Sequence, residues 1–224
     1  MITDAKLPQK SLVEALFGPD CVVEAAAPAL VDHELFAEEH AHIARSVPKR
    51  RAEFGTARVC ARRALTRLGV APVSLVPTDD RAPRWPNGVV GSISHTSNYC
   101  AVVVASARAY LSLGLDIEQD KSLEPEMAAM ICTAHELSTL ATRSPHDAIV
   151  YFSAKEAFYK CQYPLTQRLL DFRDVELELD FARGTFQARV LLERRARPAW
   201  LDRLRGRFTR GAGLVHCGIT LAAP

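Results

Sequence analysis

Residues 112–118 are Ser-Leu-Gly-Leu-Asp-Ile-Glu, a stretch in which aliphatic residues alternate with Gly114, Asp116 and Glu118. This alternation predicts a β-strand, because successive side chains of a strand point to opposite faces of the sheet. One face of the strand is then purely aliphatic, and Asp116 and Glu118 emerge together on the other. Two neighbouring acids repel each other unless a cation lies between them. The pair belongs either to a solvent-exposed edge or to a site for a cation such as Mg²⁺.

Both halves of the chain around this strand mix helices with short alternating segments. Helices are expected at 33–46, 48–68, 133–140 and 144–162, and strands at 22–23, 89–94, 99–105, 175–179, 186–190, 205–209 and 214–221. Short polar or glycine-containing turns separate several of the strands, which is typical of antiparallel hairpins. Helices beside antiparallel strands predict an α+β fold.

The composition is that of an ordinary globular protein. Of the 224 residues, 48% are hydrophobic and 24% are charged, which excludes a disordered or fibrous chain. The formal net charge of +2 is too close to neutrality for a general nucleic-acid or membrane-binding polycation. The six cysteines are scattered, without the spacing of a zinc site or a disulfide framework, so buried free thiols are expected.

The sequence shows no targeting segment and none of the common nucleotide or hydrolase motifs. The longest uncharged apolar run, 99–107, is far shorter than the ~20 residues of a membrane helix, and no signal peptide precedes it. We therefore expect a soluble, cytoplasmic protein without a membrane partner. The motifs G-x-x-x-x-G-K-[ST], G-x-G-x-x-G, H-E-x-x-H and G-x-S-x-G are missing, so kinase, Rossmann, zinc-protease and esterase hypotheses lose their main support.

The helix expected at 48–68 carries several arginines. Arg51, Arg58 and Arg62 lie along one edge of its apolar stripe, and Arg58 lies near the angular position of Phe54. A cation there either reaches solvent along its aliphatic stem or meets an anion in a cleft. Most charge runs are solvated helix faces, so the arginines alone do not decide.

Two further segments bring polar groups into apolar surroundings. In 152–160, Phe-Ser-Ala-Lys-Glu-Ala-Phe-Tyr-Lys, Glu156 and Lys160 are four residues apart, which fits either a surface ion pair or the wall of an apolar cleft. His95 lies in the turn after 91–94, Gly-Ser-Ile-Ser. An exposed histidine is the ordinary case in a turn, and an anion-binding turn is the alternative.

Together these segments resemble the 4′-phosphopantetheinyl transferases of the long, pseudo-dimeric type, nearest the branch that serves siderophore, nonribosomal-peptide and polyketide synthases. Four blocks in the family's order carry the resemblance. They are Arg50-x-x-Glu53-Phe54-x-x-x-Arg58-x-Cys60-Ala61-Arg62, Trp85-Pro86-x-Gly88-x-x-Gly91-Ser92-x-Ser94-His95-Thr96, Gly114-Leu115-Asp116-Ile117-Glu118 and Phe152-Ser153-x-Lys155-Glu156-Ala157-x-x-Lys160. Three positions depart from it: Ala57 replaces a common glycine, and Ser94 and Thr96 replace the threonine and cysteine of the siderophore branch.

The resemblance implies an enzyme that moves the 4′-phosphopantetheine arm of coenzyme A onto a serine of an apo acyl or peptidyl carrier domain, releasing 3′,5′-ADP. It implies Mg²⁺, or Mn²⁺ in its place, held by Asp116, Glu118 and Glu156. Such an ion neutralises charge on pyrophosphate oxygens. Glu156, or a water that it positions, is the implied proton acceptor, and Lys155 and His95 complete the implied catalytic set.

The resemblance also implies how coenzyme A is bound. The residues expected to contact it are Arg50, Arg58, Arg81, Ser94, His95, Lys155 and Lys160. The three arginines would clamp its phosphates, because a guanidinium binds phosphate in a bidentate manner. We expect two similar-sized α+β lobes in a pseudo-twofold arrangement, 1–111 and 112–224, each with a small, mainly antiparallel sheet packed on helices and with the site at their interface. A monomer is expected.

Two other hypotheses stay open on the residues alone. The helix arginines could bind nucleic acid while the acids are structural, which predicts steeply salt-dependent affinity and no magnesium dependence. The chain could also be another coenzyme A enzyme, such as an acyltransferase, although thioester chemistry leaves the three acids unexplained. The resemblance itself implies no nucleic-acid partner.

Overall fold

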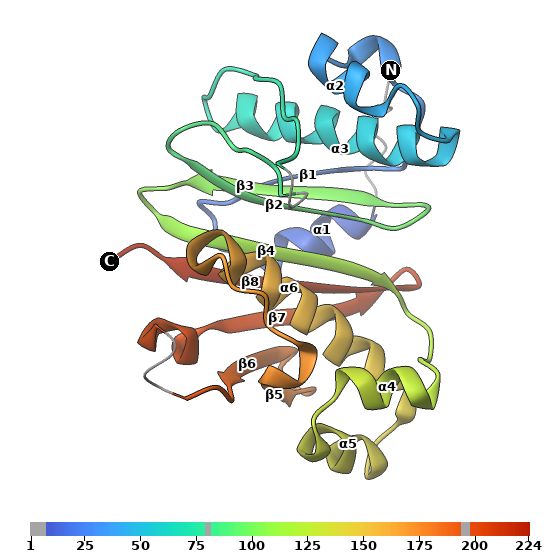
Figure 1. The fold of residues 1–224 in the computed structure, drawn as a ribbon, viewed down its shortest axis with the longest axis vertical. Helices are drawn as coiled ribbons and strands as arrows, with labels where there is room; N and C mark the ends of the chain where they lie inside the picture. Colours follow the sequence, from blue (N-terminus) through green and yellow to red (C-terminus); the bar gives the residue numbers. More distant parts are fainter. Residues whose placement is uncertain (1–7, 79–81, 194–197) are drawn as a thin grey trace.

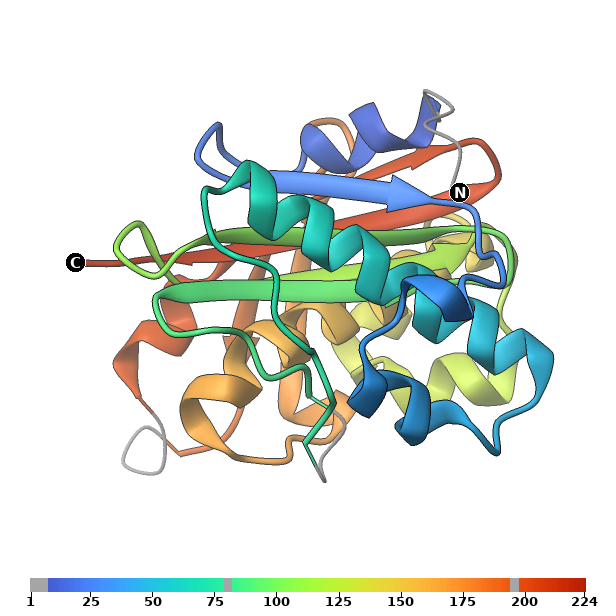
Figure 2. The same ribbon diagram turned by 90° about the horizontal axis from the view of Figure 1, so that it is seen from above.

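The computed structural model describes residues 8–78, 82–193 and 198–224, and it contains two antiparallel sheets with helices packed on them. The two sheets follow one another along the longest axis of the molecule (Figure 1). Seen from above, the helix Pro48–Arg67, named α3, runs along the strands of the first sheet (Figure 2). The predicted α+β fold is confirmed.

The first sheet has the strand order β1-β3-β2. Its strands are β1 (Val22–Ala26), β2 (Val89–His95) and β3 (Cys100–Ser106). On one face, Val102 and Val104 of β3 pack in a cluster with Leu65 of α3. On the other face, Val103 packs in a second cluster with Leu115 of the strand β4 (Tyr110–Gln119). The central strand is therefore apolar along nearly its whole length, because both of its faces are covered.

The second sheet has the order β4-β8-β7-β6-β5. Its strands are β4 (Tyr110–Gln119), β5 (Val175–Asp180), β6 (Thr185–Val190), β7 (Arg205–Gly211) and β8 (Leu214–Ala222). The predicted aliphatic face of β4 is fully buried, with Leu113, Leu115 and Ile117 each at most 1% exposed. Helix α6 (Ala148–Thr166) packs against the opposite face of the sheet, where Phe158 joins a cluster with Cys217.

The helices differ from the prediction in four places. The described residues form α1 (Pro8–Glu14), α2 (Ala37–Ile43), α3, α4 (Pro125–Ile131), α5 (Ala134–Ala141) and α6 (Ala148–Thr166), with short 3₁₀ helices at Asp32–Glu34, Pro145–Asp147, Phe172–Asp174 and Ala199–Arg203. α1 and α4 were not predicted, and the helix expected at 33–46 is split. α6 continues past Pro164 and ends at Gln167, whose φ of 53° is left-handed. A proline in the last turn removes only one hydrogen bond.

The two sheets meet where β2 lies beside β4, and serine side chains connect them. The Ser92 hydroxyl accepts a hydrogen bond from the backbone N–H of Leu115, and the Ser94 hydroxyl accepts one from that of Ile117, both at 3.0 Å. Because both residue numbers advance by two, the strands run in the same direction. The hydroxyls stand in for the carbonyl oxygens of a ladder and satisfy buried donors of β4.

A buried glutamate ties together the elements of the first half. Glu39, in α2, has no exposed surface. Its carboxylate accepts hydrogen bonds from the backbone N–H groups of Phe36 (3.1 Å) and Leu75 (2.8 Å) and from the guanidinium of Arg62 (2.7 Å). It thus joins a helix start, a downstream segment and the long helix α3.

The second half repeats this device. Glu136, in α5, is also fully buried and accepts from the backbone N–H groups of Thr133 (2.7 Å) and Leu177 (2.6 Å) and from the Lys155 ammonium (2.7 Å). The order β1-β3-β2 likewise corresponds to β4-β8-β7. The shared strand order and the equivalent hubs at Glu39 and Glu136 agree with the expected pseudo-twofold arrangement.

Other expectations concern thiols, membrane segments and the lobe boundary. All six cysteines are free, and all but Cys21 are buried. Within the described ranges, no helix is long and apolar enough to span a membrane. The chain passes from the first sheet to the second between Ser106 and Tyr110. The division into 1–111 and 112–224 stays a prediction.

Candidate functional site

A cleft of about 1610 Å³ lies between the two halves. Its walls come from α3, the loop before β2, β2 itself, the start of β4 and α6. The predicted site residues that line it are Arg50, Arg58, His95, Glu156 and Lys160. Arg81 lies outside the described residues. The cleft therefore gathers groups from both halves, as expected for a site at their interface.

Asp116 is buried beside this cleft. It is 3% exposed, so the hypothesis of a solvent-exposed acidic edge is wrong for this residue. Its Oδ1 accepts hydrogen bonds from the Lys160 ammonium (2.6 Å) and the Ser94 hydroxyl (3.2 Å), and its buried Oδ2 has no hydrogen-bond partner. Lys160 thus pairs with Asp116 and supplies a countercharge from α6 to β4.

The charge of Asp116 changes the pKa values of the other two acids, Glu118 and Glu156. Burial raises the pKa of Glu118 to about 7, with a further increase from the charges of Asp116 and Glu156. Burial and the charge of Asp116 also raise the pKa of Glu156. Lys160 opposes both increases. Two acids with raised pKa values facing one lysine form an electrostatic cluster that favours an additional cation.

The residues fit a divalent cation by their chemistry. Three carboxylates are the hard oxygen ligands that Mg²⁺ prefers, and the Oδ2 atom of Asp116 is buried without a partner. Across residues 8–78, 82–193 and 198–224, no three His, Cys, Asp or Glu side chains are arranged to hold a metal ion as they stand. The metal-ligand set of Asp116, Glu118 and Glu156 therefore stays a prediction.

Arg58 is a buried cation on the cleft wall. It is 6% exposed, its Nε donates to the carbonyl of Leu75 (2.6 Å), and its guanidinium lies 4.0 Å above the centre of the Phe54 ring. Burial lowers its pKa to about 10. A buried guanidinium that faces a cleft is stabilised by an anion. The Arg58 head therefore does not reach solvent along its stem, and its contact with an anion stays a prediction.

Other arginines of α3 are engaged within their own half. Arg51 pairs with Asp32, Arg62 with Glu39 and Arg67 with Glu24. These intramolecular pairs neutralise part of the basic charge of α3, and the expected lack of a nucleic-acid partner stays a prediction.

Lys155 is buried inside the second half and pairs with Glu136. Its side chain is 2% exposed, and its ammonium donates to the carbonyls of Ile131 (2.8 Å) and Phe172 (2.8 Å) and to the Glu136 carboxylate (2.7 Å). All three N–H groups are used inside the second half. Lys155 also lines the small groove that contains Glu156, and its expected role toward the pyrophosphate and in catalysis stays a prediction.

Three aromatic residues of the cleft wall were not predicted as part of the site. Tyr159 and Tyr163 stack on each other, with ring centres 5.3 Å apart, and both line the cleft. Their i,i+4 spacing could have revealed this pair. Trp85 packs against Gly91, where an added Cβ would lie 2.7 Å from the ring, and its indole N–H donates to the Gly91 carbonyl (3.0 Å). The tryptophan and the glycine of the second block are therefore needed together.

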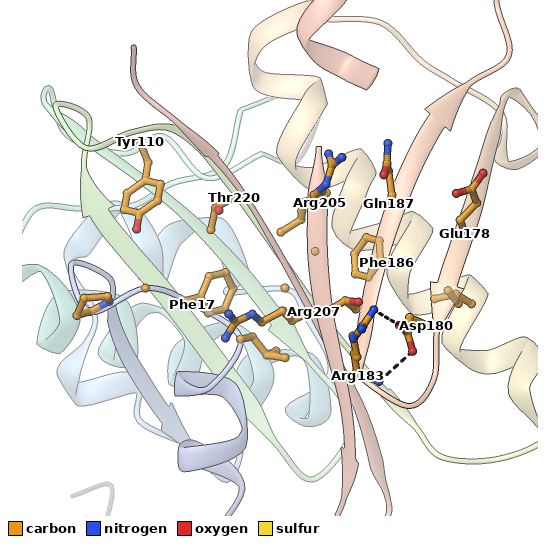
Figure 3. Close-up of a pocket in the computed structure, with 18 residues that line it drawn as sticks. Phe17, Tyr110, Glu178, Asp180, Arg183, Phe186, Gln187, Arg205, Arg207 and Thr220 are labelled. Carbon is orange, nitrogen blue, oxygen red and sulfur yellow. Dashed lines mark hydrogen bonds and ion pairs between the residues drawn. The ribbon is translucent and has the colours of Figure 1, made fainter. Parts of the chain in front are cut away.

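Two further hollows differ in character. An apolar groove of about 350 Å³ adjoins Glu156 and is lined by Phe158, Tyr159, Leu170 and Phe172 among others. Figure 3 shows the second, a depression of about 940 Å³ over β6, β7 and β8 that contains no predicted site residue. Its charged side chains partly pair with one another, as Arg183 does with Asp180 (3.3 Å). A polar, solvated face is ordinary for an antiparallel sheet.

Comparison with known proteins gives consistent results for both halves. The model of the 4′-phosphopantetheinyl transferase N-terminal domain matches residues 38–105, and that of the 4′-phosphopantetheinyl transferase superfamily matches 112–208. The 4′-phosphopantetheinyl transferase Svp of Streptomyces mobaraensis is 46% identical over 201 residues, which cover 85% of this chain and 80% of the relative.

More distant relatives agree. The 4′-phosphopantetheinyl transferase PptT of Mycobacterium tuberculosis is 38% identical over 192 residues, 82% of this chain and 85% of the relative. Enterobactin synthase component D of Salmonella typhi is 34% identical over 145 residues, 62% of this chain and 60% of the relative. With both halves matched in order and the cleft residues brought together between them, the chain belongs to the 4′-phosphopantetheinyl transferase superfamily and is an enzyme of that class.

Proposed function

We propose that this enzyme transfers the 4′-phosphopantetheine arm of coenzyme A to a serine of an apo acyl or peptidyl carrier domain and releases 3′,5′-ADP in a Mg²⁺-dependent reaction. The observation that carries the proposal is buried Asp116, joined to Lys160 and Ser94 beside a cleft of about 1610 Å³. An acid held by a lysine at the edge of a large basic cleft suits a substrate that carries a pyrophosphate.

The cationic wall would bind the phosphates. Arg50 and Arg58, on α3, and Lys160, on α6, face the cleft from opposite halves. A bound diphosphate would give the desolvated Arg58 guanidinium its anionic partner and would draw Lys160 away from Asp116. As coenzyme A enters, Lys160 would thus exchange the Asp116 carboxylate for the diphosphate.

Asp116, Glu118 and Glu156 would hold Mg²⁺, with Mn²⁺ as a substitute. When bound, such an ion neutralises charge on the pyrophosphate and the leaving group. Glu156, whose pKa is raised by burial and by Asp116, would accept the serine proton directly or through a water. The apolar groove beside Glu156 has a surface suited to the uncharged part of the arm.

The test incubates the protein with coenzyme A, Mg²⁺ and a panel of apo carrier domains, and follows the mass of each intact carrier. We expect a carrier to gain the mass of one phosphopantetheine. When a chelator is present from the start, we expect no gain in mass. Glu156→Gln should lower kcat by about 10²- to 10⁴-fold, because it removes the proton acceptor. Glu126→Gln, an exposed acid of α4, is the matched control. Near-full activity of Glu156→Gln, or no mass gain on any carrier, would refute the proposal.

A further inference from the structure

Glu53 belongs to the first block of the family resemblance but has no role in the function proposed above. It lies on α3 one turn after Arg50 and is 9% exposed. Its Oε2 is 3.9 Å from Nδ1 of His95, which ends β2. The imidazole is therefore held between two side chains of one helix, with Glu53 at one ring nitrogen and Arg50 at the other.

Arg50 identifies the protonation of this ring. Its Nη1 lies 3.3 Å from Nε2 of His95. A guanidinium has donors only, so the contact requires a lone pair on Nε2. A neutral imidazole carries its proton on the other nitrogen, and Nδ1 therefore bears the hydrogen that faces Glu53.

The charges around His95 explain why an acid is needed. Burial lowers the pKa of His95, and Arg50 and Arg58 of α3 and Lys160 of α6 lower it further. Among the described charged groups that face the ring, Glu53 raises the pKa of His95. Without Glu53, the three cations near the imidazole would have no acid to oppose them, and no negative group would favour one orientation of the ring.

We propose that Glu53 is a positioning residue: it fixes His95 with the proton on Nδ1, so that Nε2 holds the Arg50 guanidinium at the cleft. The role rests on the proposed function in so far as Arg50 binds a phosphate of coenzyme A. Glu53 acts through His95 and Arg50 and contacts no substrate itself. Through these contacts, the charge of the buried Glu53 fixes the orientation of Arg50, which is expected to bind a phosphate.

The first test uses the free protein, labelled with ¹⁵N. Long-range ¹H–¹⁵N spectra distinguish a protonated ring nitrogen from one with a lone pair. We expect neutral His95 to be protonated at Nδ1, and Glu53→Gln to move the His95 titration to lower pH, because a negative charge is removed. Glu24→Gln, a similarly buried acid of β1 paired with Arg67, should leave the titration unchanged. An Nε2-protonated ring, or an unchanged midpoint in Glu53→Gln, would overturn the proposal.

The second test measures transfer kinetics with the same variants. Glu53→Gln should raise KM for coenzyme A by about threefold or more with a smaller change in kcat, the loss expected for one weakened hydrogen bond. An equal loss of activity in Glu24→Gln would indicate general destabilisation and would count against the proposal. Because the spectra need no coenzyme A, they decide the role of Glu53 even if the proposed transfer activity fails.

Discussion

Lys155 and Lys160 stand five residues apart on α6 and serve different purposes. Five residues turn a helix by roughly 140°, so the two ammonium groups leave on different sides. Lys155 neutralises Glu136 inside the second half, whereas Lys160 neutralises Asp116 beside the cleft. A lysine of α6 therefore stabilises the buried core of the second half at position 155 and the acid beside the cleft at position 160.

The first prediction separates these roles by substitution. Lys155→Met leaves the buried Glu136 carboxylate without its countercharge, and loss of one partner of a buried pair costs about 3–5 kcal/mol. We expect that decrease in the unfolding free energy, measured by urea denaturation. Lys160→Met also removes the countercharge of a buried acid, Asp116, but the Lys160 side chain is 29% exposed, so water partly replaces it. We expect a smaller loss of stability than for Lys155→Met, together with lower carrier modification. Equal stability of the two variants would contradict this assignment.

The sequence could predict some residue-level features of the site. The alternation of 112–118 correctly placed Asp116 on the face opposite the leucines, because strand geometry depends on local spacing alone. It could not predict that Lys160 pairs with Asp116 rather than with Glu156, four residues away on the same helix. That choice depends on how closely α6 packs on β4, which is a property of the tertiary structure.

At the scale of elements, the contact between β4 and α6 is unusually close at Gly114. An added Cβ at this position would lie 1.9 Å from the carbonyl oxygen of Ala157, so backbone itself approaches backbone. This approach brings Asp116 of the strand next to Lys160 of the helix.

Gly114→Ala is therefore expected to displace α6 and to lower the unfolding free energy by about 3 kcal/mol or more, as overpacking against backbone does. Thermal and urea denaturation measure this effect. Gly55→Ala, in α3, should cost clearly less, because the nearest atom to its Cβ is a Val31 methyl group that can move. A Gly114→Ala variant as stable as the parent would show that α6 can shift without cost.

Local signals explain which elements were predictable. The capping box of Thr133 and Glu136 correctly indicated where α5 begins. The additional bonds of Glu136 to Lys155 and Leu177 join residues far apart in sequence, so no local pattern contains them. α1 and α4 are seven residues long, too short for a recognisable helical period.

At the scale of the whole molecule, a buried histidine links stability to pH. His216 of β8 has no exposed surface and packs edge-on against Tyr99, the residue just before β3, so it lies where the two sheets meet. Burial lowers its pKa from 6.5 to about 4. Its contribution to stability is complete above pH 6.5 and is lost as the pH falls toward 4, because the unfolded state then binds the proton and the folded state does not.

We expect this histidine to cost about 2 kcal/mol of unfolding free energy between pH 7 and pH 5. Glu118 and Glu156 act in the opposite direction, so the comparison is between the parent and His216→Phe, which share both acids. Urea denaturation at the two pH values should show the loss in the parent only. His33→Gln, whose histidine is largely exposed, should behave like the parent. The same loss in parent and His216→Phe would contradict the assignment.

The assembled site shows what lies beyond sequence patterns. The four sequence blocks that carry the family resemblance lie in both halves of the chain. Several of their predicted site residues line one cleft in the structure. The distance between the halves depends on how the aliphatic face of β4 packs on the first sheet, which no spacing in the chain specifies.

The serine contacts between β2 and β4 have an evolutionary consequence. A continuous backbone ladder would fix the offset of the two strands whatever their side chains. Here Ser92 and Ser94 alone provide the hydrogen bonds described between them. The offset between the arginine side and the acidic side of the cleft thus depends in part on two hydroxyl groups. Substitution of either serine is a route by which related sequences would adjust the register of one sheet against the other.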